Sequence, residues 1–154
     1  MDFQLNLHTE SIEHAKPAVP VAVEPLTSVR QVLGLMRDRS TGSVLVCQEK
    51  RLLGIFTERD ALKLLASGSC LDVPIREVMT PNPTTLRADD TVATAIRKMS
   101  FGTFRRLPIV DSSGRVMGIL RASQIVRYMV EHFPQTVYTL PPEPHPMTHE
   151  REGA

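Results

Sequence analysis

The stretch Gly54-Ile-Phe-Thr-Glu-Arg-Asp60 decides the fold, because its beginning recurs further along the chain as Gly118-Ile-Leu120. Residue 118 follows residue 54 by 64 positions, and at the same separation Leu45-Val46 corresponds to Ile109-Val110. A repeat of this length indicates two copies of one supersecondary unit that pack against each other.

Each copy predicts a strand, a helix, two further strands and a second helix. The first strands are expected at residues 20–23 and 83–86. The helix after each of them has apolar residues at positions i, i+3, i+4 and i+7, the period of a helix with one buried face. Thr27 or Ser28 is expected to cap the first of these helices, and Asp89 or Asp90 the second.

The second half of each copy contains an apolar strand pair and a closing helix. The strands are expected at 43–47 and 52–56 in the first copy, and at 107–110 and 116–120 in the second. The closing helices are expected at 58–66, ended by Gly68, and at 123–132, ended before Pro134.

These elements predict an α/β (α+β) fold, in which two β-α-β-β-α units pack around a pseudo-twofold axis. Each unit alone is too short to bury a comfortable core. We expect an N-terminal extension at 1–16, a first unit at 17–67, a linker at 68–75, a second unit at 76–133 and a proline-rich tail at 134–154. The tail is expected to be extended or disordered, or to dock on a neighbouring surface.

Composition narrows the classes of partner. A net charge of +1 and 5% aromatic residues, without tryptophan, argue against nucleic acid. No apolar run approaches the ~20 residues that span a bilayer, and the N-terminus lacks the features of a signal peptide. Cys47 and Cys70 have no metal-like spacing and are expected to be one buried and one surface thiol, which suits a reducing compartment. We therefore expect a cytoplasmic protein that binds neither nucleic acid nor a membrane.

Four passages resemble the CBS domain, a family of regulatory modules that occur as tandem pairs (Bateman modules). They are residues 54–60, Val78-Met-Thr-Pro81, Arg105-Arg-Leu-Pro-Ile-Val-Asp111 and Val116-Met-Gly-Ile-Leu120. The first matches the family pattern Gly-hydrophobic-x-Thr/Ser-x-x-Asp, and the third is close to His/Arg-Arg-Leu-Pro-Val-Val-Asp. The resemblance extends over residues 17–132.

The resemblance implies a stand-alone pair with clefts between two sheets that bind AMP, ADP, ATP or S-adenosylmethionine. It also implies a homodimer formed through the repeats, and regulation of a partner enzyme or transporter. AMP or ATP is the ligand that we expect, and the sequence does not decide whether Mg²⁺ accompanies its phosphates.

Thr57 and Asp60 form the sharpest candidate pair, where a predicted strand ends and a predicted helix begins. A helix N-terminus favours phosphate through its free N–H groups and its dipole, and the threonine hydroxyl can donate to a phosphate oxygen. By the resemblance, the Asp60 carboxylate accepts two ribose hydroxyls. The same Thr-x-x-Asp spacing also fits a helix capping box, and one carboxylate can serve both roles.

The second copy departs from this pattern, because Arg121 replaces the threonine and Gln124 replaces the aspartate. Gln124 can hydrogen-bond a ribose without a charge, while Arg121 either binds phosphate or is exposed to solvent. Arg105 and Arg106 either grip phosphate oxygens with their guanidinium forks or form a solvated basic pair. We therefore expect one good site around Asp60 and one degraded or altered site.

Further candidates for the cleft come from the strands. By the resemblance Thr84 helps to hold the nucleotide, although ordinary β-propensity also explains a threonine there. Ile55 and Phe56, with Pro108 and Ile109, either wall the adenine or belong to the core, as alternation along a strand predicts.

No nucleophile, base and acid stand together in the sequence, and it contains no P-loop or glycine-rich dinucleotide motif. His145 and His149 are four residues apart, but Pro146 between them argues against a helical metal pair, and we expect solvated tail histidines. We therefore predict a non-catalytic regulatory module that senses an adenine nucleotide in the cleft between the repeats. One alternative is a ligand-free interaction module that dimerises and docks a partner through the tail. A second is an RNA- or DNA-binding module that uses a face of arginines, formed by Arg105, Arg106, Arg115, Arg121 and Arg127.

Overall fold

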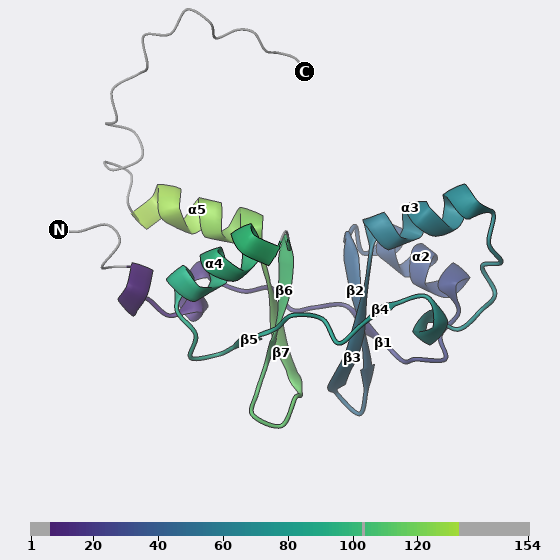
Figure 1. Cartoon of the computed structure of the whole chain (residues 1–154), viewed down its shortest axis with the longest axis horizontal. Helices are drawn as coiled ribbons and strands as arrows, with labels where there is room; N and C mark the ends of the chain where they lie inside the picture. Colours follow the sequence, from purple (N-terminus) through teal and green to yellow (C-terminus); the bar gives the residue numbers. More distant parts are fainter. Residues whose placement is uncertain (1–6, 103, 133–154) are drawn as a thin grey trace, which may run out of the picture.

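The predicted strand-helix-strand-strand-helix order occurs twice in the computed structural model, which describes residues 7–102 and 104–132 (Figure 1). The first repeat comprises β1 (Ala22–Val23), α2 (Val29–Asp38), β2 (Ser43–Gln48), β3 (Arg51–Thr57) and α3 (Glu58–Ser67). The second comprises β5 (Leu86–Arg87), α4 (Val92–Gly102), β6 (Arg106–Val110), β7 (Val116–Arg121) and α5 (Ala122–His132). The predicted fold class is confirmed. The tail predicted at 134–154 lies outside the described residues.

Each repeat forms its own small sheet with the same connectivity. The first strand is parallel to the second, and the second is antiparallel to the third. The first sheet gains a fourth strand, β4 (Thr80–Pro81), from the segment that leads into the second repeat. Reciprocally, Ala18 at the entry of the first repeat pairs with Ile119 of β7. The entry segment of each repeat therefore lies against the last strand of the other.

The two sheets lie in the centre of the molecule, and the helices cover their outer sides (Figure 1). Side chains alternate along a strand, so β2 contributes to two cores. Val44 and Val46 pack under the helices of the first repeat, whereas Leu45 and Cys47 pack toward the second sheet, where they meet Ile119. This shared core joins the repeats, as expected for units too small to be stable alone.

Helix caps in the first repeat follow the sequence prediction. The Ser28 hydroxyl caps α2 by accepting a hydrogen bond from the Gln31 backbone N–H at 3.1 Å. Gly68 ends α3 in the left-handed conformation with φ of 68°, which a glycine adopts without steric cost. These two signals were readable because each is a local property of a few consecutive residues.

The predicted cap of α4 by Asp89 or Asp90 is wrong. The Thr91 hydroxyl accepts from the Thr94 backbone N–H at 3.2 Å, which is the capping geometry one residue further on. Asp90 instead accepts from the Arg87 backbone N–H at 2.8 Å, because it closes the turn between β5 and α4.

The chain ahead of the first repeat completes the core of the second one. Leu7, Ile12 and Ala15 are buried among the apolar residues of α4, α5 and the second sheet. The last two belong to a 3-10 turn, η1 (Ile12–Ala15), and the Ile12 N–H donates to the Asp90 carbonyl at 3.1 Å. In the same way, the expected linker ends in η2 (Ile75–Glu77), whose Ile75 lies in the first core.

Candidate functional site

Two hollows open between the repeats, on either side of the shared core. The larger one, which we call the Asp60 hollow, has a volume of about 400 Å³. It is lined by Ile55, Thr57, Glu58, Arg59, Asp60, Lys63, Thr80, Pro83, Thr84, Phe104, Arg105 and Arg106. The hollow therefore joins the end of β3 and the start of α3 in the first repeat to the entry strand and the β6 approach of the second. Its size falls within the range of ~300–1,000 Å³ typical of small-molecule sites.

Asp60 holds the first turn of α3 and still reaches into the hollow. One carboxylate oxygen, Oδ2, accepts from the Thr57 backbone N–H at 2.9 Å and from the Thr57 hydroxyl at 3.1 Å. The other oxygen, Oδ1, has only a contact of 3.5 Å from the Thr80 hydroxyl, which is long for a hydrogen bond. The capping box predicted from the sequence is thus present, and it leaves acceptor capacity on Oδ1.

Four cationic side chains line the Asp60 hollow. Arg59 and Lys63 come from α3, while Arg105 and Arg106 come from the approach to β6. They face two carboxylates, those of Glu58 and Asp60, so that positive charge is in excess. An excess of guanidinium and ammonium groups favours an anionic ligand.

Arg106 crosses from the second repeat to the first. Its Nη2 atom lies 3.8 Å from Oε1 of Glu58, and its side chain is 26% exposed. Gly42 makes room for it, because a side-chain carbon at that position would collide with the guanidinium and lie 2.8 Å from the Glu58 carboxylate. A side chain at residue 42 would therefore require the Arg106 guanidinium or the Glu58 carboxylate to move aside.

Not every sequence candidate lines the Asp60 hollow. Phe56 is completely buried in the core of the first repeat, and Pro108 is buried within β6. Neither residue lines the hollow, so walling a ligand does not fit their positions. Ile55 does line it, because alternation along β3 turns its side chain away from that of Phe56.

Phe104 is one of the lining residues that sequence reasoning missed, with Glu58, Arg59, Lys63, Thr80 and Pro83. Its side chain is 40% exposed, and it stands directly before the Arg105-Arg106 pair. An aromatic residue beside two cations at a strand entry was the available signal, since a ring face can stack on a planar base. Among the others, Lys63 lies beyond the motif that ends at Asp60, whereas Thr80 stands inside the Val78-Met-Thr-Pro81 passage but was not singled out as a site residue.

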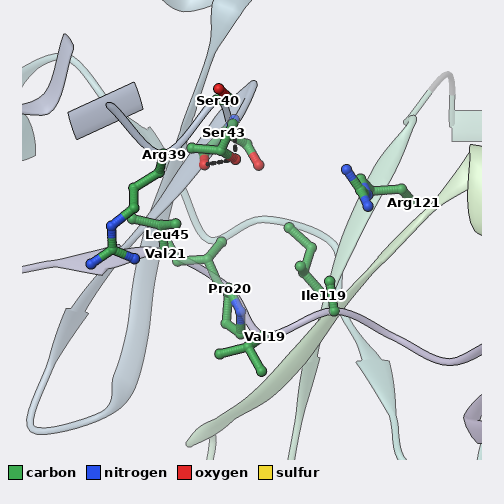
Figure 2. Close-up of a pocket in the computed structure, with 11 residues that line it drawn as sticks. Val19, Pro20, Val21, Arg39, Ser40, Ser43, Leu45, Ile119 and Arg121 are labelled. Carbon is green, nitrogen blue, oxygen red and sulfur yellow. Dashed lines mark hydrogen bonds between the residues drawn. The ribbon is translucent and has the colours of Figure 1, made fainter. Parts of the chain in front are cut away.

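Gln124 occupies the position in the second repeat that Asp60 has in the first, and both of its polar groups are engaged. Its Oε1 accepts from the Arg121 backbone N–H at 2.7 Å, and its Nε2 donates to the Lys16 carbonyl at 2.9 Å. Arg121 lines the second hollow between the repeats (Figure 2). The two hollows are therefore unequal in charge and in polar groups.

Four of the five arginines considered for a nucleic-acid face line three different hollows. Arg105 and Arg106 belong to the Asp60 hollow, Arg121 to the second hollow and Arg127 to a third one beside Glu131 on α5. Among the described residues there is no cluster of three or more side chains suited to hold a metal ion. Nor does any described helix have the length and apolar character needed to cross a bilayer.

A family model described as CBS domain matches residues 16–67 and 75–131, the two repeats of the structure. The chain belongs to the CBS domain family. The first matched segment contains Asp60, and the second contains Arg105, Arg106, Arg121 and Gln124.

Solved CBS pairs resemble this one in fold and sequence. The structure of CBSX2 in complex with AMP is 28% identical, covers 82% of this chain and 95% of that one, and superposes with a TM-score of 0.67. The CBS domain pair of MJ0100, in complex with 5′-methylthioadenosine and S-adenosyl-L-methionine, is 25% identical, covers 76% and 97%, and gives a TM-score of 0.69.

Curated relatives include longer proteins. Arabinose 5-phosphate isomerase KdsD of Francisella tularensis is 29% identical over 125 residues, which are 80% of this chain and 38% of that enzyme. The CBS pair thus corresponds to a minor part of the isomerase, and this chain spans less than two thirds of the length of the first curated relatives that it matches.

Proposed function

We propose that this CBS pair is a non-catalytic regulatory module that binds an adenine nucleotide in the Asp60 hollow. The observation that carries the proposal is the carboxylate of Asp60, whose Oδ1 stays available beside four cationic side chains. A carboxylate accepts the two hydroxyls of a ribose, and guanidinium groups bind phosphate oxygens. The AMP and S-adenosylmethionine complexes of similar CBS pairs support the same class of ligand.

The charge of the Asp60 hollow favours a phosphorylated ligand over S-adenosylmethionine. The tail of AMP or ATP is anionic, whereas the sulfonium of S-adenosylmethionine is a cation. With four cationic and two anionic lining side chains, the hollow attracts the first and repels the second. We therefore expect AMP or ATP to bind more tightly than S-adenosylmethionine, with Phe104 and Ile55 against the base.

Calorimetric titration tests this proposal with AMP, ATP and S-adenosylmethionine on the wild type and on Asp60→Asn. Asparagine keeps an acceptor for the α3 cap but removes the charge, so the fold is retained. Because hydrogen bonds to a charged group contribute about 1.5–3 kcal/mol, we expect AMP affinity to fall at least tenfold. Inorganic phosphate affinity should change little, since it contacts the cations.

Asp89→Asn is the matched control, because Asp89 is an exposed carboxylate that does not line the hollow. It should bind AMP as the wild type does. If Asp60→Asn and the wild type bind AMP equally well, the ribose role of Asp60 is wrong. If no adenine nucleotide binds the wild type, the ligand-free interaction module becomes the better description.

The interaction module is the second candidate, and exposed apolar side chains favour it. Leu62 and Leu65 on α3 are 67% and 56% exposed, and Val126 on α5 is 62% exposed. Exposed apolar side chains that form a patch mark a surface that a partner or a second copy can bury. We propose a homodimer through these helices, a partner enzyme or transporter as the regulated target, and a cytoplasmic location.

A further inference from the structure

The second hollow between the repeats, which we call the Arg121 hollow, differs from the Asp60 hollow in size and chemistry. Its volume is about 180 Å³, less than half that of the Asp60 hollow and below the ~300 Å³ at which small-molecule sites begin. Figure 2 shows Arg121 reaching from the β7 side toward the space below Ser40 and Ser43, with Pro20 along the floor.

Ser43 is the buried polar residue of the described part of the chain, and it lines this hollow. Only 6% of its surface is exposed. Its backbone groups bond to the Thr41 hydroxyl at 3.0 and 3.4 Å, but its own hydroxyl makes no hydrogen bond to any described residue. Because Ser43 lines the hollow, this free hydroxyl can form a hydrogen bond to a group that enters it.

The charged groups of the Arg121 hollow are all positive. Arg39 and Arg121 line it from opposite sides, and no aspartate or glutamate lines it (Figure 2). Neither arginine forms an ion pair with a carboxylate among residues 7–102 and 104–132.

A second arginine increases the positive charge at Arg121. Arg106 stands directly opposite it in the β6–β7 ladder, and like charges in that position destabilise a strand pair. Arg106 has Glu58 as its counter-charge at 3.8 Å, whereas Arg121 has none within the described chain. An anion in the Arg121 hollow would therefore neutralise the one member of the pair that the protein leaves uncompensated.

A nucleoside does not suit this hollow. No lining carboxylate is available for a ribose diol, and Gln124, at the position equivalent to Asp60, is occupied on both sides by Arg121 N–H and the Lys16 carbonyl. The small volume excludes a base and a sugar together. What remains is a compact ligand with oxygen acceptors for Arg121 and for the hydroxyls of Ser40 and Ser43.

We propose that the Arg121 hollow binds a small oxyanion of the phosphate class, held by Arg121 and the Ser43 hydroxyl, and that it does not bind a nucleoside. This inference does not rest on the proposed function of the Asp60 hollow, because the two hollows share no lining residue. The protein would then respond to two different anionic ligands, one on each side of the shared core.

The test is an NMR titration of the ¹⁵N-labelled full chain with sodium phosphate, in a phosphate-free buffer at constant ionic strength. We expect saturable shifts of the amide signals of residues 40–43 and 119–121. Arg121→Gln should weaken phosphate at these signals roughly tenfold, because a charge-assisted bond is lost. Ser43→Ala should weaken it roughly three- to tenfold, because one neutral hydrogen bond is lost. Arg127→Gln, an arginine outside both hollows, is the matched control and should change nothing.

Two probes separate this site from the Asp60 hollow. Adenosine, which lacks phosphate, should leave the signals of Ser40 and Ile119 in place, and Arg105→Gln should leave their phosphate response unchanged. Both residues line the Arg121 hollow and not the Asp60 hollow. The proposal is overturned if these signals shift linearly without saturation, if Arg121→Gln responds like the wild type, or if adenosine saturates them. AMP shifts at Thr57 and Arg105 report the Asp60 hollow in the same spectra, so failure of either site is recognised separately.

Discussion

Cys47 and Cys70 have the same side chain in opposite surroundings. Cys47 is buried between the sheets, and burial raises the pKa of its thiol, while Cys70 is exposed. The prediction of one buried and one surface thiol is confirmed. Because the thiolate is the reactive form, Cys47 carries less of it at a given pH and is also shielded from reagents.

We predict that iodoacetamide modifies Cys70 rapidly and Cys47 only after unfolding. Mass spectrometry of the native chain at mildly alkaline pH should show a single fast modification, and a second one should appear in urea. Cys70→Ser is the control, because it should abolish the fast phase alone. Rapid modification of native Cys70→Ser would contradict a closed core between the sheets.

At the scale of elements, the β6–β7 hairpin is held by one carboxylate. Asp111 Oδ1 accepts from the backbone N–H of Arg115 at 3.0 Å, and from the hydroxyl and backbone N–H of Ser113, both at 2.8 Å. The Arg115 N–H first, and then the Ser113 hydroxyl, lower the pKa of Asp111 below its ordinary value. Gly114 supports the turn with φ of 84°, a conformation that a glycine adopts readily.

The lowered pKa of Asp111 determines how its contribution to the stability of the fold changes with pH. The folded state binds the proton of Asp111 less tightly than the unfolded state does. The contribution of the Asp111 carboxylate to stability is therefore complete above the ordinary aspartate pKa of about 3.9. It is lost as the pH falls through the pKa of Asp111 in the folded state. We predict that the unfolding free energies of the wild type and Asp111→Ala differ at neutral pH and converge toward about pH 2.

Urea unfolding followed by circular dichroism across this pH range measures the difference. Asp89→Ala is a suitable control, since no hydrogen bond to the Asp89 carboxylate is found in the described chain. The difference in unfolding free energy between the wild type and Asp89→Ala should stay constant across the pH range. A gap between wild type and Asp111→Ala that stays constant to the lowest pH would mean that the carboxylate charge does not hold the hairpin.

The sequence predicted the elements well, because their signals are local. Apolar periodicity and the 64-residue repeat predicted the order of strands and helices, and Gly68 predicted the end of α3. The cap of α4 was missed because Asp90 and Thr91 are both good capping residues. The path of the backbone between β5 and α4 decides which of them caps, and composition does not contain that information.

The hollow was only partly predictable for a related reason. Thr57, Asp60 and Arg105 stand in motifs, and the structure brings them together. Phe104 reaches the same hollow because the second repeat packs against the first, and Lys63 lines it from α3, one turn after Asp60 and outside the motif. Their roles, like those of the predicted residues, stay predictions until a ligand is bound.

At the scale of the whole molecule, each repeat depends on chain that precedes or follows the other. Ile12 is fully buried in the core of the second repeat although it stands ahead of the first, and β4 extends the first sheet on the way to the second. The repeats are therefore not independent units, which agrees with their small size. A ligand between them contacts both halves of one cooperative structure.

The outer helices α3 and α5 carry part of the exposed apolar surface. Leu62 on α3 and Val126 on α5 are related by the 64-residue repeat, and they are 67% and 62% exposed. Both helices run along the same edge of the molecule (Figure 1). Equivalent apolar positions on two pseudo-symmetric helices suit an isologous contact, in which the same patch of two copies meets. We therefore expect a second copy to cover this edge.

The double variant Leu62→Lys/Val126→Lys tests this expectation by size-exclusion chromatography with light scattering. The wild type should have about twice the chain mass of 17.2 kDa, and the variant should have that mass itself, because two charges would be buried in each half of the contact. Met117→Lys, which adds a charge at a 57% exposed position on β7, is the control and should stay dimeric. A wild type that is monomeric at every concentration would contradict the predicted homodimer. A dimer that survives the double variant would move the contact to another surface.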